Sequence, residues 1–188
     1  MNILIKSIEA EYRRYKALAE GALAQVPEPL LSAPGPGNGN SLATICWHVA
    51  GNLQSRFTDF LTTDGEKAWR RREEEFVART VSREALLAKW AAGWDVLLSA
   101  LASLGDDDLQ TTVTIRRQPL AVHEALHRSL AHLSYHVGQI VYLAHSLCGP
   151  AWRYLSIPPG GSDAVNAQPT FDTPLAHAKM VEERTRQS

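Results

Sequence analysis

The sequence predicts an all-α protein, a bundle of four long helices followed by a loop-rich tail. Four long stretches carry apolar side chains every three or four positions, which is the spacing of an amphipathic helix. Segments rich in proline, glycine or aspartate separate these stretches. With 188 residues, of which 45% are hydrophobic and 21% charged, the chain has the size and composition of one globular domain.

The first predicted helix spans residues 2–26. It ends at Pro27, because proline lacks a backbone donor and cannot continue a helix. Residues 34–40, which read Pro-Gly-Pro-Gly-Asn-Gly-Asn, predict a loop. Ser41 follows and is a residue type that favours the N-cap position. A second helix is therefore expected from Ser41 to about Leu61.

Residues 66–80 predict a connection exposed to solvent, because basic and acidic side chains dominate this segment. A turn of helix there would allow ion pairs between residues four positions apart. The expected pairs are Arg70 with Glu74 and Arg71 with Glu75.

The second half of the chain carries the other two predicted helices. Ser82 is an N-cap candidate for a third helix that reaches about Leu104. Residues 112–116 alternate apolar and polar side chains and predict a short extended segment. It leads into a fourth helix over about residues 119–147. In the tail, Pro174 to Arg184 could form a marginal helix.

Charge and cysteine content narrow the function classes. The 19 Lys+Arg and 20 Asp+Glu residues give a formal net charge of -1, so the chain lacks the basic surface that non-specific nucleic-acid binding requires. No apolar run approaches the roughly 18 residues of a membrane span. Cys46 and Cys148 form no CxxC pattern, which fits a reducing compartment. We expect a cytoplasmic protein with no nucleic-acid or membrane partner.

Two histidines in the fourth predicted helix are candidate metal ligands. His132 and His136 lie four positions apart, so their imidazoles share one face and can bind one ion. An isolated pair of this kind is more often structural, and His123 and His127 have the same spacing. His123 is expected in a solvated first turn, whereas His132 and His136 lie among apolar residues, where an imidazole needs a partner.

His48 offers a third imidazole, in an equally apolar part of the second predicted helix. If the second and fourth helices are neighbours, His48, His132 and His136 can meet at one divalent cation. Three neutral ligands leave the full charge on such an ion, which would lower the pKa of a bound water to roughly 7 and make hydroxide or a coordinated thiolate available at neutral pH. We expect zinc or nickel, with iron or manganese left open, because imidazole binds all of these.

Asn52 and Arg56 follow His48 at intervals of one helical turn and face the same side. Arg56 could hold an anionic substrate group. It could equally pair with Asp59 or Glu66 near the end of the helix.

Tyr135 and Gln139 lie beside the two histidines of the fourth helix and could orient a ligand or a bound water. Each could instead be a core residue with one satisfied polar atom. Gln139 ranks higher, because it shares the stripe of His132 and His136. Cys46 lies about 200° around the helix from His48, so it should point away from the ion.

Five stretches of this sequence carry a resemblance to a known family. They are HVAGNLQSR at 48–56, FLTTDGEK at 60–67, RRQPLAV at 116–122, HLSYHVGQIV at 132–141 and WRYLSIP at 152–158. On these motifs the chain resembles the DinB-like superfamily of four-helix-bundle proteins, in a branch that has no agreed reaction. The resemblance implies a metal held by one histidine of the second helix and two of the fourth, hence His48, His132 and His136. It also implies a homodimer.

The expected organisation is a metal-binding four-helix domain over residues 1–150 and a tail over 151–188 that packs on it, with an end that could be disordered. Characterised relatives of the family include thiol-dependent transferases and apparent hydrolases. The first hypothesis is therefore a metal-dependent hydrolase or a transferase of low-molecular-weight thiols acting on a small-molecule substrate. The second is a non-catalytic, dimeric metal- or ligand-binding stress-response module. The third is a helical interaction protein whose histidines are merely buried.

Overall fold

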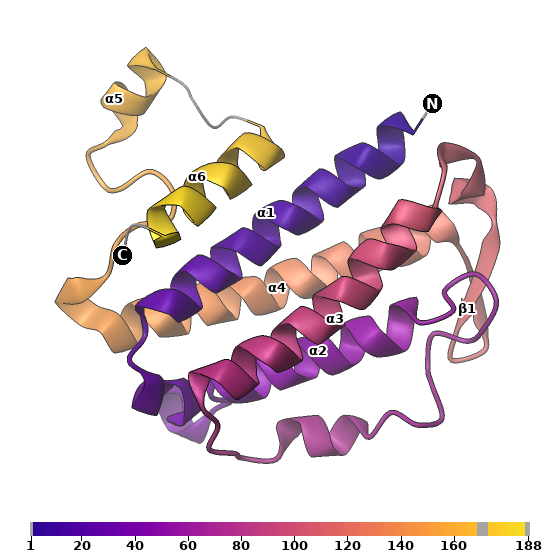
Figure 1. Ribbon diagram of the computed structural model, residues 1–188, viewed down its shortest axis with the longest axis horizontal. Helices are drawn as coiled ribbons and strands as arrows, with labels where there is room; N and C mark the ends of the chain where they lie inside the picture. The colour runs from indigo at the N-terminus through magenta and orange to yellow at the C-terminus, as the bar shows by residue number, and fades with distance from the viewer. Residues whose placement is uncertain (1, 169–172, 187–188) are drawn as a thin grey trace.

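The computed structural model describes residues 2–168 and 173–186 (Figure 1). The protein is mostly helical, with 70% helix and 6% strand. Within the described residues it has six α-helices and one sheet of two antiparallel strands. This agrees with the predicted predominance of helix. It adds a hairpin, of which the sequence predicted only the first strand.

Four long helices form the body of the molecule (Figure 1). They are α1 (Ile3–Gln25), α2 (Leu42–Phe57), α3 (Arg83–Ser103) and α4 (Val122–Cys148). α2 packs against α3, α1 packs against α4, and α2 also contacts α4. The contact between α2 and α4 is the one on which the predicted metal site depends.

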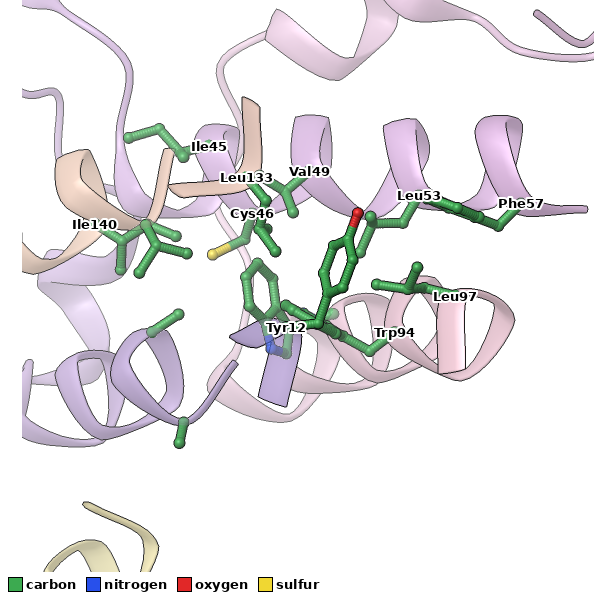
Figure 2. Close-up of a cluster of buried hydrophobic side chains, with 14 of the residues drawn as sticks. Tyr12, Ile45, Cys46, Val49, Leu53, Phe57, Trp94, Leu97, Leu133 and Ile140 are labelled. Carbon is green, nitrogen blue, oxygen red and sulfur yellow. The ribbon is translucent and has the colours of Figure 1, made fainter. Parts of the chain in front are cut away.

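A continuous apolar core joins the four long helices. Figure 2 shows Tyr12 of α1, Cys46 of α2, Trp94 of α3 and Leu133 of α4 in one cluster. Tyr12 is fully buried, and its hydroxyl donates a hydrogen bond of 2.9 Å to the carbonyl of Leu126. Burial of these groups in apolar surroundings raises the pKa of both Tyr12 and Cys46.

Serine caps begin two of the helices as the sequence predicts. The Ser41 hydroxyl accepts the backbone N–H of Thr44, and the Ser82 hydroxyl accepts that of Ala85. α2 is shorter than expected, because it ends at Phe57 rather than near Leu61.

The fourth helix begins three residues later than predicted, at Val122. Pro119 instead belongs to β2 (Gln118–Ala121), which pairs with β1 (Thr112–Ile115). The reason is a two-residue turn at Arg116 and Arg117, both with positive φ, which reverses the chain into a hairpin. β1 corresponds to the predicted extended segment.

The tail contains more regular structure than its composition predicts. α5 (Ser162–Ala167) is a short helix, and α6 (Pro174–Arg186) packs along α1. His177, Ala178 and Val181 of α6 are buried in this contact, which explains why a weakly helical segment is stable. The sequence allowed for a disordered C-terminal end. Residues 187 and 188 of that end lie outside the described residues, and residues 174–186 are helical.

One helix bears on the expectation about membranes. Among the described residues, α3 is long and apolar enough to cross a membrane by length and composition, although Lys89 and Asp95 interrupt it. About 33% of its most apolar window is buried inside the protein, including Trp90 and Trp94. One such helix is weak evidence for a membrane span, since a core helix passes the same test.

Candidate metal centre

Three histidines from α2 and α4 converge at one point. Nε2 of His132 lies 3.3 Å from Nε2 of His48 and 3.1 Å from Nε2 of His136. The potential ligand atoms of all three lie within 4.8 Å of one another. His48 is buried, and His132 and His136 are half-buried. The structure thus positions the three predicted histidines to bind one metal ion.

The two separations that involve His132 fit ligands of a single divalent cation. Metal–nitrogen bonds of about 2.0–2.1 Å place two ligand nitrogens roughly 2.9 Å apart at a right angle and roughly 3.4 Å apart at a tetrahedral angle. The observed separations of 3.1 and 3.3 Å fall within that range. The potential ligand atoms of His48 and His136, which lie on different helices, are no more than 4.8 Å apart.

Hydrogen bonds on the outer side of two rings set their protonation. Nδ1 of His48 lies 2.9 Å from the carboxylate of Glu75, and Nδ1 of His136 lies 2.8 Å from the amide oxygen of Gln139. Both partner atoms are acceptors, so each Nδ1 donates, and in the neutral ring each Nε2 then keeps its lone pair. In that tautomer the Nε2 lone pairs of His48 and His136 face Nε2 of His132, which is the arrangement that a shared cation requires.

Glu75 is a site residue that the sequence interpretation assigned to a solvated turn. It lies in a 3₁₀ turn at Arg72–Phe76, and only 7% of its surface is exposed. The expected pairs Arg70 with Glu74 and Arg71 with Glu75 are wrong. Arg70 instead binds both carboxylate oxygens of Glu75 at 2.8 Å. Because a 3₁₀ turn has three residues per turn, helix spacing does not apply here.

The 3₁₀ turn contacts α2 closely because α2 has a glycine at the crossing. A side chain at Gly51 would overlap the carboxylate of Glu75. Phe76 then covers one face of His48, with ring centroids 4.7 Å apart. Phe76, an apolar residue inside a strongly charged run, is a sequence signal that this segment folds back onto the protein.

The surroundings of His132 and His136 lower the pKa of both rings, which favours their neutral form. Burial lowers the pKa of His132 to about 4, and the neighbouring His136, His48, Arg56 and Arg70 act in the same direction. Burial also lowers the pKa of His136, against the hydrogen bond to Gln139, which raises it. Neutral imidazole is the form that binds a metal ion.

Burial alone would raise the pKa of Glu75. The hydrogen bonds from His48 and Arg70 outweigh this effect, so the pKa of Glu75 is lowered. The side chain that orients His48 is therefore an anion, which increases the basicity of the ring toward a cation.

Gln139 and Tyr135 were the predicted site residues of α4 besides the two histidines. Gln139 orients His136, and its amide nitrogen donates to the Tyr135 hydroxyl at 3.2 Å. Tyr135 is 62% exposed and is hydrogen-bonded to no ring of the site in the described structure.

Two other residues were expected to lie outside the site. Cys46 points into the core, as expected (Figure 2). His123 is half-buried rather than solvated, because its Nδ1 lies 2.9 Å from the carbonyl of Leu109.

Asn52 and Arg56 both line a cavity of about 210 Å³ beside the histidines. Of the two interpretations for Arg56, the structure shows the ion pair with Glu66, at 3.2 Å. Arg56 also donates to the carbonyl of Gly65. His48 and His132 form part of the wall of the same cavity, so the candidate metal site is open on this side.

Fold and site together define a mostly helical protein with a three-histidine group suited to a divalent cation. The chain belongs to the family described as "Protein of unknown function (DUF1572)", whose model matches residues 2–161. That range includes all three histidines and Glu75. Comparisons with the curated proteins and with the solved structures give no match.

Proposed function

We propose that the protein is a divalent-metal-dependent enzyme of the DinB-like type, a hydrolase or a transferase of low-molecular-weight thiols that works in the cytoplasm. The observation that carries this proposal is the convergence of three ring nitrogens, two with lone pairs fixed by Glu75 and Gln139, at the wall of a cavity. A structural metal site is usually closed by four protein ligands, whereas three ligands beside a cavity leave room for a substrate.

The residues of this chain would divide the work as follows. His48, His132 and His136 would hold the ion, zinc or nickel in the first place, with iron or manganese as alternatives. Bound there, a divalent cation supplies Lewis acidity and lowers the pKa of a water or thiol at its open position. Glu75 and Gln139 would keep two rings in the binding tautomer, and the cavity would hold the substrate.

Metal analysis of protein purified without a histidine tag tests the binding step. We expect one equivalent of a divalent metal per chain in the wild type and a loss of most of it in His132→Ala. His127→Ala is the matched control, because His127 lies exposed on the same helix. A wild type without bound metal, or a His132→Ala variant with unchanged metal content, would contradict the proposal.

The reaction itself is tested with a panel of esters, amides and electrophiles, each with and without cysteine, glutathione or another small thiol. Turnover that needs the metal and disappears in His132→Ala supports an enzyme. Thiol dependence separates the transferase from the hydrolase. Full metal occupancy with no turnover on the panel would favour the alternative, a non-catalytic metal- or ligand-binding module of a stress response.

We also propose that the protein is a homodimer. Tyr135 and Tyr142 lie two helical turns apart on α4 and are 62% and 74% exposed. Exposed tyrosines of this kind are typical of interfaces, because their rings are apolar and their hydroxyls remain hydrogen-bonded. Sedimentation at micromolar concentration tests the dimer, and a single monomeric species would contradict it.

A further inference from the structure

The cavity beside the three histidines is lined by arginines. Five of its thirteen lining residues are arginines, contributed by α2, by the segment before the 3₁₀ turn and the turn itself, by the hairpin and by α4. They are Arg56, Arg70, Arg72, Arg116 and Arg128. No carboxylate of the described chain lines it. The walls are therefore strongly cationic even before a metal ion is counted.

The carboxylates behind the walls are too few to neutralise these charges. Glu66 is shared by three guanidinium groups, those of Arg116 at 2.9 Å, Arg56 at 3.2 Å and Arg70 at 3.9 Å. Arg70 has a second partner in Glu75 and is only 2% exposed, so it is a satisfied structural cation. Arg56 and Arg116 are left with one carboxylate between them.

Arg128 and Arg72 are exposed residues of the cavity wall and add positive charge to it. In the part of the chain that the structure describes, no carboxylate lies within 4 Å of Arg128. Arg72 pairs with Glu73, whose side chain is 88% exposed, and such a solvated pair neutralises little. The positive charge of these two arginines is thus available to a ligand.

The hairpin holds Arg116 at this position against a conformational preference. Arg116 and Arg117 have φ of 54° and 62°, a region in which asparagine or glycine is favoured. The turn is held by Asp64, whose carboxylate accepts the backbone N–H groups of Arg116 at 2.9 Å and Arg117 at 2.7 Å. Backbone strain of this kind is typical of functional positions.

We infer that this cavity binds an anionic oxygen group, a carboxylate or a phosphate, of the substrate whose reacting part lies at the three histidines. Guanidinium groups bind both anions through paired N–H donors. The volume of about 210 Å³ is below the roughly 300–1,000 Å³ of drug-sized sites, so the cavity has room for a small acid or for one anionic group of a larger molecule. The inference deepens the proposed function and rests on it for the placement of the reacting group.

Isothermal titration calorimetry with inorganic phosphate, and separately with acetate, tests the inference on the protein as purified. We expect saturable binding of one anion per chain. Arg116→Gln and Arg128→Gln should each weaken it about tenfold or more, the loss typical of one charged hydrogen bond. Arg117→Gln is the matched control, since Arg117 shares the turn conformation but does not line the cavity, and it should stay within about twofold.

Stronger binding of phosphate than of acetate would assign a phosphoryl group to the substrate, and the reverse order a carboxylate. Absence of binding, or equal binding in the Arg116, Arg128 and Arg117 variants, would overturn the inference. Metal content measured on the same samples separates it from the proposed function. If the protein binds a full equivalent of metal but shows no arginine-dependent anion binding, only the inference of an anion site is contradicted. If anion binding depends on the arginines but the protein takes up no metal, only the proposed metal centre is contradicted.

Discussion

The carboxylate of Glu75 lies 2.9 Å from Nδ1 of His48, and both side chains are buried. The two residues are 27 positions apart, and the 3₁₀ turn that carries Glu75 is laid along α2. Arg70 binds the same carboxylate through two nitrogens. An arginine, a carboxylate and an imidazole thus form a chain that ends at the candidate metal site.

Replacing Glu75 by glutamine should weaken metal binding. The amide oxygen of the new side chain can still accept a hydrogen bond from His48, but a neutral amide no longer makes the ring more basic. The change also leaves Arg70 without its buried counter-charge. We expect a loss of about 10- to 100-fold in metal affinity, the usual effect of removing such a partner. Competition with a chromophoric chelator measures it.

Glu74→Gln is the control for Glu75→Gln, because Glu74 is the neighbouring carboxylate and is exposed. Its metal affinity should equal that of the wild type. Equal affinities in both variants would show that the Glu75 carboxylate does not act on the metal site.

Much of the fold followed from local sequence signals. Ser41 and Ser82 begin helices because a serine hydroxyl accepts a backbone N–H wherever it precedes a helix. The three histidines were found because helical spacing fixes which side chains share a face. Both rules depend only on near neighbours in the chain.

The features that were missed depend on distant contacts. Asp64 stabilises the unusual turn at Arg116 from 52 positions away, so the hairpin has no Asn-Gly signal of its own. Glu75 and Arg70 read as surface charges, because their burial is set by contact with α2 and not by local composition. No local rule identifies which charge in a charged run is buried.

The close approach of Gly51 to Glu75 predicts a coupled pair of variants. Gly51→Ala should destabilise the protein by about 1–3 kcal/mol, because the new methyl group overlaps the carboxylate held by His48 and Arg70. In the Glu75→Ala background the obstacle is gone, and the helix propensity of alanine should make the same change neutral or stabilising by up to about 1 kcal/mol. Urea unfolding of the four proteins measures the coupling. Equal costs in both backgrounds would contradict the contact.

The hairpin should lose stability in acid through Asp64. Hydrogen bonds from the backbone N–H groups of Glu66, Arg117 and Arg116 lower the pKa of Asp64 to about 2. A carboxyl with a lowered pKa in the folded state stabilises the protein above its ordinary pKa of about 3.9, and this contribution is lost as the pH falls toward 2.

Asp64→Asn should therefore lower the unfolding midpoint at pH 6 and flatten the stability profile between about pH 4 and pH 2. Urea titrations at a series of pH values measure this, with Asp59→Asn as the control, because Asp59 accepts hydrogen bonds only through its backbone carbonyl in the described structure. Parallel profiles for wild type and Asp64→Asn would show that the carboxylate does not hold the turn.

Two glycines in helix interiors should respond in opposite directions to alanine. A Cβ at Gly93 of α3 would lie 2.7 Å from Cα of Ala50 in α2, so Gly93→Ala must push the two helices apart. Gly138 of α4 has nothing within 4 Å of the corresponding position. Within a single chain, alanine there only removes the conformational freedom of glycine from the unfolded state, so the measurement is made on the monomer, because Gly138 shares a helical face with Tyr135 and Tyr142. We expect Gly93→Ala to lose about 1–3 kcal/mol and Gly138→Ala to gain about 0.5–1 kcal/mol in the free energy of unfolding. Urea unfolding at a common m-value measures both, and a stabilised Gly93→Ala would mean that α2 and α3 do not approach this closely.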